Sequence, residues 1–259
     1  MEEIIRLENV SKKYKGKSKS IFEKPKEFIA VNDVSFSINK GEIFGLVGES
    51  GSGKTTLGHL IIGLKSMSQG KIYFKGRDIS TFTREEEKKW RKQVQIIFQN
   101  PYSALDPKRK IGWSIEEILM IHKIGDKASR RKMAEEILYE VEIDPSLMDQ
   151  YPEDLSGGQR QRVSIASALI VNPEFVIIDE GVSALDVSVQ SAILNLIRKL
   201  QEKRQFTCLF ISHDLNVIEY LCDRVGVMYK GEMVEIFNAG EFFESEHHEY
   251  TQKLFSTLL

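Results

Sequence analysis

A glycine-rich octapeptide, Gly48-Glu-Ser-Gly-Ser-Gly-Lys54-Thr55, constrains the fold of this chain more than any other feature of its 259 residues. The short apolar segment Ile43–Val47 precedes it, and the segment Thr55–Leu64 that follows has a helical pattern. Glycines here let successive backbone N–H groups curl around phosphate oxygens, and the N-terminus of the helix adds partial positive charge. Lys54 can reach the β- and γ-phosphates of a nucleotide, and the Thr55 hydroxyl can ligate Mg²⁺. The residues expected to line this phosphate site are Gly48, Ser50, Gly51, Ser52, Gly53, Lys54, Thr55 and Thr56.

A second short strand is predicted to end in two acidic residues. Carboxylates at this place are suited to bind the metal ion that accompanies the nucleotide phosphates. The sequence Phe175-Val-Ile-Ile-Asp179-Glu180 is an apolar run followed at once by two carboxylates. It would place Asp179 at the carboxyl end of a strand, beside the phosphate loop, where it can hold the water shell of a metal ion. Glu180 would face the attacking water as a general base or a positioning group. Because such runs are common alone, this prediction depends on the phosphate loop upstream.

The pentapeptide Leu155-Ser156-Gly157-Gly158-Gln159 predicts a second anion-binding helix start. We expect Ser156 to cap a helix from about Gln159 to Ile170, with the two glycines baring the backbone N–H groups before it. Arg160 and Arg162 follow just behind. One chain would then present two phosphate-binding surfaces, one on each of two subdomains.

Strand and helix patterns alternate along the chain, which predicts an α/β fold with a mostly parallel sheet. Ile4–Val10 and Val31–Ile38 alternate as strands of an antiparallel sheet, whereas the pattern is helical from Ile111 to about Gln150. The other expected elements are strands at Lys71–Phe74, Val94–Phe98, Phe175–Ile178, Thr207–Ser212, Arg224–Tyr229 and Met233–Phe237 and a helix at Val187–Leu200. We therefore expect one domain, with 1–98 and 172–259 as a nucleotide-binding core that includes an antiparallel β subdomain, and 99–171 as an inserted helical subdomain.

Composition narrows the class of protein. The formal net charge is −2, so the chain has no general electrostatic attraction for nucleic acid, and phosphate binding must come from a local site. The longest apolar runs fall far short of the ~18 residues that span a bilayer, and the acidic start does not resemble a signal peptide. Two cysteines, Cys208 and Cys222, are too few for a disulfide framework and are expected in the core. The lysine-rich stretch Lys12–Lys26 is expected to be a solvated loop, with attraction of a polyphosphate or an anionic lipid surface as the alternative.

In combination, these motifs resemble ATP-binding cassette ATPases over essentially the whole chain. The phosphate loop, Gln99, Leu155–Gln159, Asp179-Glu180, Ser183–Asp186 and His213 occur in the family's order. The resemblance implies a head-to-tail dimer in which each ATP lies between one chain's phosphate loop and the other chain's signature helix. It assigns nucleotide contacts across that interface to Ser156, Gly157, Gly158, Gln159 and Asp186.

The resemblance also assigns roles to three single residues. Tyr14 would stack on adenine. Gln99 would sense Mg²⁺ and the attacking water and report to the membrane partner, and His213 would hydrogen-bond the γ-phosphate. Glu180, His213 and Gln99 are thus the expected catalytic residues, and Thr55, Gln99 and Asp179 the expected metal ligands.

Further stretches resemble the ATPases of oligopeptide, dipeptide and nickel importers, and most closely the second of their two cassettes. They are Phe98–Pro107, Asp186–Gln190, His248-Glu-Tyr250-Thr251 and the insertion after Tyr14. This resemblance implies ATP and Mg²⁺ as cofactors and uptake of peptides or a nickel or metal-chelate solute. The implied partners are a paralogous cassette, with a homodimer possible in isolation, two transmembrane permeases and, indirectly, an extracytoplasmic solute-binding protein. The implied location is peripheral, on the cytoplasmic face of the cell membrane.

Three alternatives remain open at this stage: an exporter ATPase, a soluble cassette protein of DNA repair or translation, and a chain that binds ATP only to regulate. Gly181-Val182 stands where many family members have Pro-Thr, which affects the expected turnover rate more than competence. No iron–sulfur cluster is expected, because the cysteines of longer relatives' tails are missing. His247-His248 is expected to belong to a solvated tail.

Overall fold

The computed structural model describes residues 2–15, 27–98, 105–179, 186–241 and 246–256. By their internal contacts the residues form two compact units, the first comprising Met1–Glu87 and Thr207–Leu259 and the second Lys88–Phe206. The sequence-based division into a core and an inserted helical subdomain, with boundaries at 98/99 and 171/172, stays a prediction. Among the described residues, none of the helices combines the length and hydropathy that a bilayer span requires.

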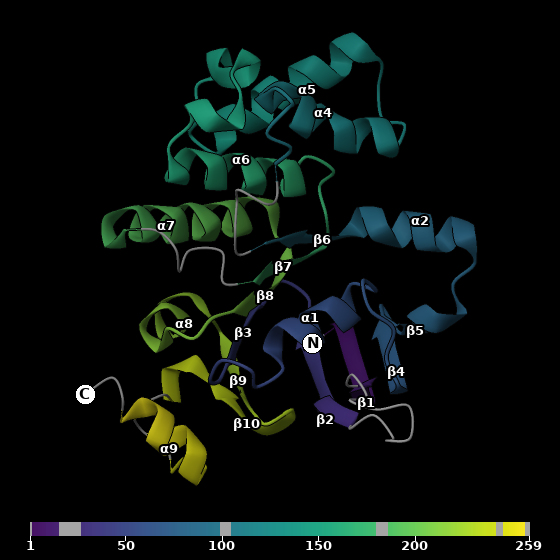
Figure 1. Ribbon diagram of the computed structural model, residues 1–259, viewed down its shortest axis with the longest axis vertical. Helices are drawn as coiled ribbons and strands as arrows, with labels where there is room; N and C mark the ends of the chain where they lie inside the picture. Colours follow the sequence, from purple (N-terminus) through teal and green to yellow (C-terminus); the bar gives the residue numbers. More distant parts are fainter. Residues whose placement is uncertain (1, 16–26, 99–104, 180–185, 242–245, 257–259) are drawn as a thin grey trace, which may run out of the picture. The chain divides into compact units, whose positions relative to one another are not determined.

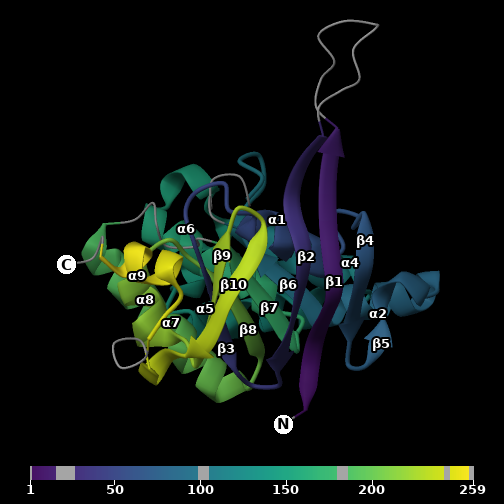
Figure 2. The same ribbon diagram turned by 90° about the horizontal axis from the view of Figure 1, so that it is seen from below.

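The first unit contains an antiparallel sheet with the strand order β2-β1-β4-β5 (Figure 2). Its strands are β1 (Glu3–Lys15), β2 (Glu27–Asn39), β4 (Gln69–Phe74) and β5 (Arg77–Asp78). The predicted antiparallel pairing of the first two strands is confirmed, but both strands are longer than expected. Lys12–Lys15 belongs to β1 and pairs with β2, so the expected solvated loop is wrong for these four residues. Positions 16–26 lie outside the described residues.

The same unit holds the strand that leads into the phosphate loop (Figure 1). This strand, β3 (Ile43–Val47), runs parallel to β8 (Thr207–Ile211) on one side and to β9 (Arg224–Tyr229) on the other. Every residue of β3 and β8 is buried, as expected for central parallel strands with an unbroken apolar sequence. The remaining elements of the unit are β10 (Glu232–Asn238), antiparallel to β9, with α1 (Lys54–Ile61), α8 (Leu215–Leu221), α9 (Glu249–Phe255) and the short 3-10 helices Ile79–Thr81 and Ala239–Glu241.

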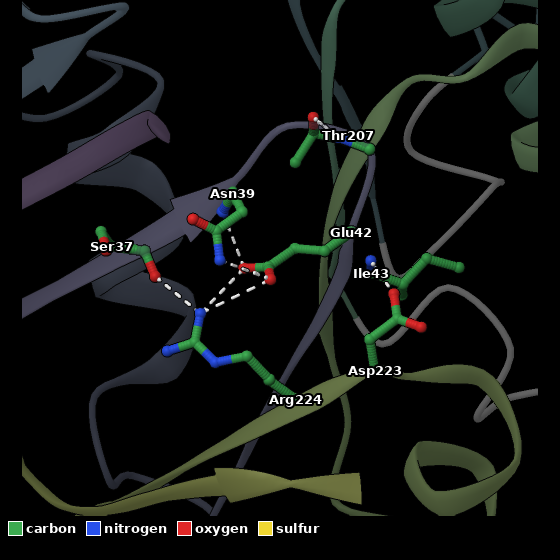
Figure 3. A network of polar contacts seen from close by, with 8 residues as sticks. Ser37, Asn39, Glu42, Ile43, Thr207, Asp223 and Arg224 are labelled. Atoms are coloured by element: carbon green, nitrogen blue, oxygen red, sulfur yellow. Dashed lines mark hydrogen bonds and ion pairs between the residues drawn. The ribbon is translucent and has the colours of Figure 1, made fainter. Parts of the chain in front are cut away.

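A polar network secures the start of β3 (Figure 3). The Glu42 carboxylate accepts hydrogen bonds from the Asn39 backbone N–H at 2.8 Å and from Arg224 Nη1 at 3.1 Å. Arg224 Nη1 also donates to the Ser37 carbonyl at 3.3 Å, and the Asp223 carboxylate accepts from the Ile43 N–H at 2.8 Å. Because β3 continues directly into the phosphate loop, this network sets where that loop begins.

The second unit pairs two parallel strands and adds a group of helices. The strands are β6 (Val94–Ile97) and β7 (Phe175–Asp179). The helices are α4 (Ile111–Ile121), α5 (Lys127–Glu140), α6 (Gly157–Leu169) and α7 (Val187–Arg204), with 3-10 helices at Pro145–Asp149 and Pro152–Asp154. Helix α2 (Arg84–Gln93) crosses the boundary between the units in sequence. The predicted α/β class is confirmed, because parallel strands alternate with helices in both units.

The helices of the second unit pack through the periodic apolar residues that the sequence marks. Ile115 and Leu119 of α4 and Ile137 and Leu138 of α5 are all buried. Arg204, at the end of α7, donates to the Glu140 carboxylate of α5 at 2.9 Å and to the Leu169 carbonyl of α6 at 2.9 Å. Burial raises the pKa of the Glu140 carboxyl, but the hydrogen bonds from Arg204 and Lys203 outweigh it and hold that pKa below its ordinary value. The bridge therefore ties three helices together.

Candidate functional site

The phosphate loop follows β3 and ends at α1, as the octapeptide predicts. Gly48 and Gly53 have φ angles of 147° and 109°, which disfavour a residue with a side chain. A Cβ atom at Gly48 would lie 2.1 Å from the Met228 carbonyl oxygen, and one at Gly53 would lie 2.3 Å from the Ala30 carbonyl oxygen. Neighbouring strands therefore approach the loop so closely that only glycine fits at either position.

The Lys54 ammonium is directed back at the loop. Lys54 is the first residue of α1 and only 4% exposed. Its Nζ donates to the Gly48 carbonyl at 2.6 Å and to the Glu49 carbonyl at 3.0 Å. A phosphate oxygen would compete with these carbonyls for the same ammonium, which is the chemistry expected of a phosphate-binding lysine.

The turn between β9 and β10 also forms a hydrogen bond with the phosphate loop. Gly231 N–H donates to the Ser52 carbonyl at 2.9 Å, and the Gly231 carbonyl accepts from the Asn32 N–H at 2.8 Å. On the helix side, Thr55 is exposed and Thr56 half-buried at the start of α1. The metal contact of Thr55 stays a prediction.

The acidic strand end lies in the second unit. Asp179 is the last residue of β7 and is 6% exposed, so its carboxylate is at the carboxyl end of the strand as predicted. Glu180, Gln99 and Ser183 lie outside the described residues, and so do Gly181 and Val182. The assigned roles of these residues stay predictions.

The signature pentapeptide forms a reciprocal helix cap. The Ser156 hydroxyl accepts from the Gln159 N–H at 3.3 Å, and the Gln159 side-chain oxygen accepts from the Ser156 N–H at 2.9 Å. Capping by Ser156 is confirmed, but α6 begins at Gly157, two residues before the expected start at Gln159. Gly158 lies against α7, where an added Cβ would be 2.7 Å from Val189 Cγ1.

A pocket of about 510 Å³ opens at this helix start. Its lining residues come from the first turns of α6 and α7: Ser156, Gly157, Gly158, Gln159, Arg162, Asp186, Ser188, Val189 and Ala192. Asp186 is the N-cap residue of α7 and is exposed there. The structure thus brings together the five residues that the sequence assigns to the opposite nucleotide.

The two arginines behind the pentapeptide differ in position. Arg162 lines the pocket and donates to Glu142 at 2.7 Å, which holds the pKa of that carboxyl below its ordinary value. Arg160 is 9% exposed and donates through Nη2 to the Glu153 carbonyl at 3.1 Å. Arg162 therefore contributes to the pocket, whereas Arg160 holds the backbone that precedes the helix.

Tyr14 and His213 both lie in the first unit. The Tyr14 ring, near the end of β1, has Lys12 Nζ 5.2 Å and Lys65 Nζ 5.3 Å from its centroid. Its hydroxyl is buried, and none of the described residues forms a hydrogen bond with it. His213 lies two residues after Ile211, the last residue of β8, and is exposed. Adenine stacking by Tyr14 and the γ-phosphate contact of His213 stay predictions.

The C-terminal segment contains contacts that sequence reasoning missed. His247 is 9% exposed, and its Nδ1 lies 2.9 Å from the Glu235 carboxylate of β10, so the expected solvated tail is wrong at this residue. Tyr250 of α9 accepts a hydrogen bond from the Glu49 N–H of the phosphate loop at 3.2 Å. The sequence marks Tyr250 only as a family feature, because local patterns carry no signal for a contact between residues 201 positions apart.

Both cysteines are buried, which confirms their expected place in the core. Cys208 is in β8 and Cys222 caps the C-terminus of α8. Burial raises the pKa of both thiols far above the usual range. Within the described residues, no three His, Cys, Asp or Glu side chains are grouped as a metal site would require.

The chain is similar in sequence to known proteins over most of its length. The family profile described as "ABC transporter" matches residues 31–183. The oligopeptide transport ATP-binding protein AppF of Bacillus subtilis is 44% identical over 258 residues, which is 99% of this chain and 78% of that protein. A putative peptide import ATP-binding protein of Brucella ovis is 46% identical over 228 residues, which is 88% of this chain and 72% of that protein.

Solved structures of ATP-binding cassettes and ABC transporter subunits have a similar fold. The ATP-binding cassette MJ0796, in a dimeric post-hydrolysis state bound to ADP and Pi, matches with a TM-score of 0.79 at 30% identity, over 91% of this chain and 98% of that chain. CbiO1 of Clostridium perfringens, part of the ABC transporter complex cbiONQ, matches with a TM-score of 0.79 at 26% identity, over 100% of this chain and 96% of that chain.

Proposed function

Because this chain belongs to the ABC transporter family, we propose that it is the ATP-hydrolysing subunit of an importer that takes up peptides. The predicted P-loop ATPase fold and the predicted family are confirmed by the comparisons. The single observation that carries the proposal is that one chain has two surfaces suited to phosphate: the loop that holds Lys54 and the pocket at Ser156. Similarity to peptide importer ATPases over 99% of the chain specifies the kind of transporter.

The residues on the phosphate loop would position ATP for attack by water. Lys54 would exchange its two carbonyl acceptors for oxygens of the β- and γ-phosphates, and the loop N–H groups would hold the same phosphates. Mg²⁺ prefers oxygen ligands, and each of the three proposed ligands, Thr55, Asp179 and Gln99, carries a side-chain oxygen. Mg²⁺ would neutralise charge on the phosphates when bound.

Glu180 is the proposed general base for the attacking water, because it directly follows the strand end that carries Asp179. His213 is proposed to hydrogen-bond the γ-phosphate, and Tyr14 to stack on adenine. Catalysis in this arrangement consists of positioning and electrostatic stabilisation, with no covalent intermediate on the protein.

The pocket at Ser156 is proposed to receive the nucleotide of a second cassette. Backbone N–H groups at the start of α6 and the nearby Arg162 suit the phosphate end of that ligand. The dimeric state of the structural neighbour MJ0796 supports this arrangement. The proposed partners are a paralogous cassette, two permeases and, through them, a solute-binding protein. The proposed location is the cytoplasmic face of the membrane.

Peptides are the proposed cargo in preference to a nickel or metal-chelate solute, because the similar proteins of Bacillus subtilis and Brucella ovis are named for oligopeptide transport and peptide import. The same names favour an importer over an exporter or a soluble repair or translation protein. The remaining alternative is a chain that binds ATP without hydrolysing it. Measuring the rate of ATP hydrolysis distinguishes this alternative from the proposed ATPase.

The test of catalysis compares two single substitutions in the assembled transporter. Glu180→Gln should lower ATP hydrolysis at least a hundredfold while leaving ATP binding intact. The control Glu219→Gln, at an exposed position of α8, should hydrolyse ATP like the wild type. Unaltered turnover in Glu180→Gln would remove Glu180 from the proposed role.

The test of the assembly is a tagged pull-down from detergent-solubilised membranes with identification of every co-purified chain. Two permeases and a second cassette would support the importer. Ribosomal or DNA-repair partners without any membrane protein would refute it. Ser156→Arg should preserve nucleotide binding to its own chain but reduce hydrolysis in the assembled transporter, because the arginine would fill the pocket offered to the partner's nucleotide.

A further inference from the structure

We propose that Tyr250 is a positioning residue for the phosphate loop, so that helix α9 sets the loop conformation that ATP meets. The inference rests on the proposed ATPase function, and it adds a residue outside the loop to the machinery that binds the phosphates. Tyr250 lies 201 positions after Glu49, the loop residue that it contacts.

The contact itself is well supported by packing. Tyr250 is 7% exposed, and its hydroxyl accepts a hydrogen bond from the Glu49 backbone N–H at 3.2 Å. The Tyr250 ring packs on Tyr229 with 4.1 Å between the ring centroids. Burial raises the pKa of Tyr250, so the side chain stays a neutral phenol at physiological pH. A neutral hydroxyl held by ring packing is a fixed acceptor for a backbone N–H.

Glu49 is the residue of the loop through which this contact acts. Its carbonyl accepts from Lys54 Nζ at 3.0 Å and from the Ser52 N–H at 3.1 Å. The peptide groups on both sides of Glu49 are therefore fixed, one by Tyr250 and the other by the loop's own donors. The Glu49 N–H shares a planar peptide group with the Gly48 carbonyl, which accepts from Lys54 Nζ at 2.6 Å. Releasing this N–H would therefore let the Gly48 carbonyl rotate away from the Lys54 ammonium.

Helix α9 is anchored independently of this hydrogen bond. His248 Nδ1 caps the helix by accepting from the Tyr250 N–H at 3.1 Å. The Glu235 carboxylate of β10 contacts His247 Nδ1 at 2.9 Å and accepts from the His248 N–H at 3.0 Å. Gln252 Nε2 donates to the His247 carbonyl at 2.8 Å. Removing only the Tyr250 hydroxyl should therefore leave the helix in place and change the loop alone.

A preorganised loop binds phosphates more tightly because less conformational entropy is lost on binding. Tyr250 also satisfies the Glu49 N–H, which would otherwise need solvent or a phosphate oxygen as its acceptor. The hydroxyl thus favours the binding-competent loop without occupying the phosphate site.

The experiment compares Tyr250→Phe with Tyr139→Phe, which removes a hydroxyl from an exposed tyrosine of α5 in the other unit. Amide hydrogen exchange of the full chain without nucleotide is followed over residues 44–57, and ATP affinity is measured by equilibrium binding with Mg²⁺. Loss of one hydrogen bond should accelerate exchange at the Glu49 amide about two- to tenfold and weaken ATP binding by a similar factor. The control should change neither quantity.

The outcomes separate positioning from a purely structural role. Unchanged exchange at Glu49 in Tyr250→Phe would overturn the proposal, and so would faster exchange with unchanged ATP affinity. If α9 were only a structural support, exchange would rise across α9 and β10 instead of in the loop. A wild-type chain that fails to bind ATP would refute the proposed function. The exchange at Glu49 needs no nucleotide and would still decide whether Tyr250 fixes the loop.

Discussion

Replacing Arg224 with alanine should destabilise the first unit, because the carboxylate it contacts is almost completely buried. The side chain of Glu42 is 10% exposed and that of Arg224 is 26% exposed, with 3.1 Å between Nη1 and Oε1. In Arg224→Ala, Glu42 would keep its two hydrogen bonds from Asn39 and lose its only cationic partner among the described residues. The Ser37 carbonyl would also lose a donor, and the Phe44 ring would lose the guanidinium 5.3 Å from its centroid.

The expected size follows from these losses. A charge-assisted hydrogen bond contributes about 1.5–3 kcal/mol, and partial access of water to the Arg224 side chain reduces this to about 2 kcal/mol. At about 2–4 °C per kcal/mol for a chain of this size, the midpoint of thermal unfolding should fall by about 4–8 °C. The assay is thermal unfolding of the purified full chain followed by circular dichroism.

A matched control is Arg198→Ala, which removes an arginine from an exposed ion pair on α7. Arg198 and Glu202 have side-chain exposures of 49% and 67%, so their pair should contribute at most about 0.5 kcal/mol, or about 2 °C. A double-mutant cycle of Arg224→Ala with Glu42→Gln should show a coupling energy of at least about 1 kcal/mol. Equal melting temperatures for the two arginine variants, or no coupling in the cycle, would refute the argument that the network holds the start of β3.

Three further predictions concern the loop, the pocket and the core. Gly48→Ala should weaken ATP binding at least tenfold in equilibrium titrations, because the added Cβ would lie 2.1 Å from a backbone carbonyl oxygen. Gly51→Ala should weaken binding less, because an added Cβ at Gly51 would have no neighbouring atom within 4 Å among the described residues. Equal losses in the two variants would contradict the steric argument. Arg162→Gln should lower the unfolding midpoint by about 1–3 °C at pH 7. The pKa of Glu142 lies below its ordinary 4.5 in the folded chain. The difference in unfolding midpoint between the wild type and Arg162→Gln should therefore be largest above pH 4.5 and shrink as the pH falls through the lowered pKa. A difference that does not depend on pH would contradict this prediction. The two buried thiols should not react with a thiol reagent until the chain is unfolded, and fast labelling of the native chain would contradict their burial.

Elements with a strong local signal were predictable from the sequence. The strands Ile43–Val47 and Arg224–Tyr229 have the predicted ends, because an apolar run bounded by polar or glycine residues leaves little freedom. The phosphate loop and the Ser156 cap were predictable for a related reason: each needs particular residue types at fixed spacing.

The errors occur where distant partners override the local pattern. A run of lysines indicates a solvated loop, but Lys12 and Lys13 pair with Val31 and Ile29 of β2, and the pairing decides their conformation. His247 lies in a polar run, yet it is buried because Glu235 supplies a carboxylate and two aromatic rings pack against it. Neither Glu235 nor the contact of Tyr250 with the loop can be inferred from the residues adjacent in sequence.

The missing side chain at Gly158 has a mechanical consequence. Because a notional Cβ there would lie 2.7 Å from Val189 Cγ1, the first turns of α6 and α7 are in contact with no slack between them. A displacement of the first turn of α6, which Ser156 caps, would therefore press on the first turn of α7, which begins directly after Asp186. A ligand that enters the pocket would contact the N-terminal ends of both helices. A movement caused by its binding or release would therefore affect α6 and α7 together.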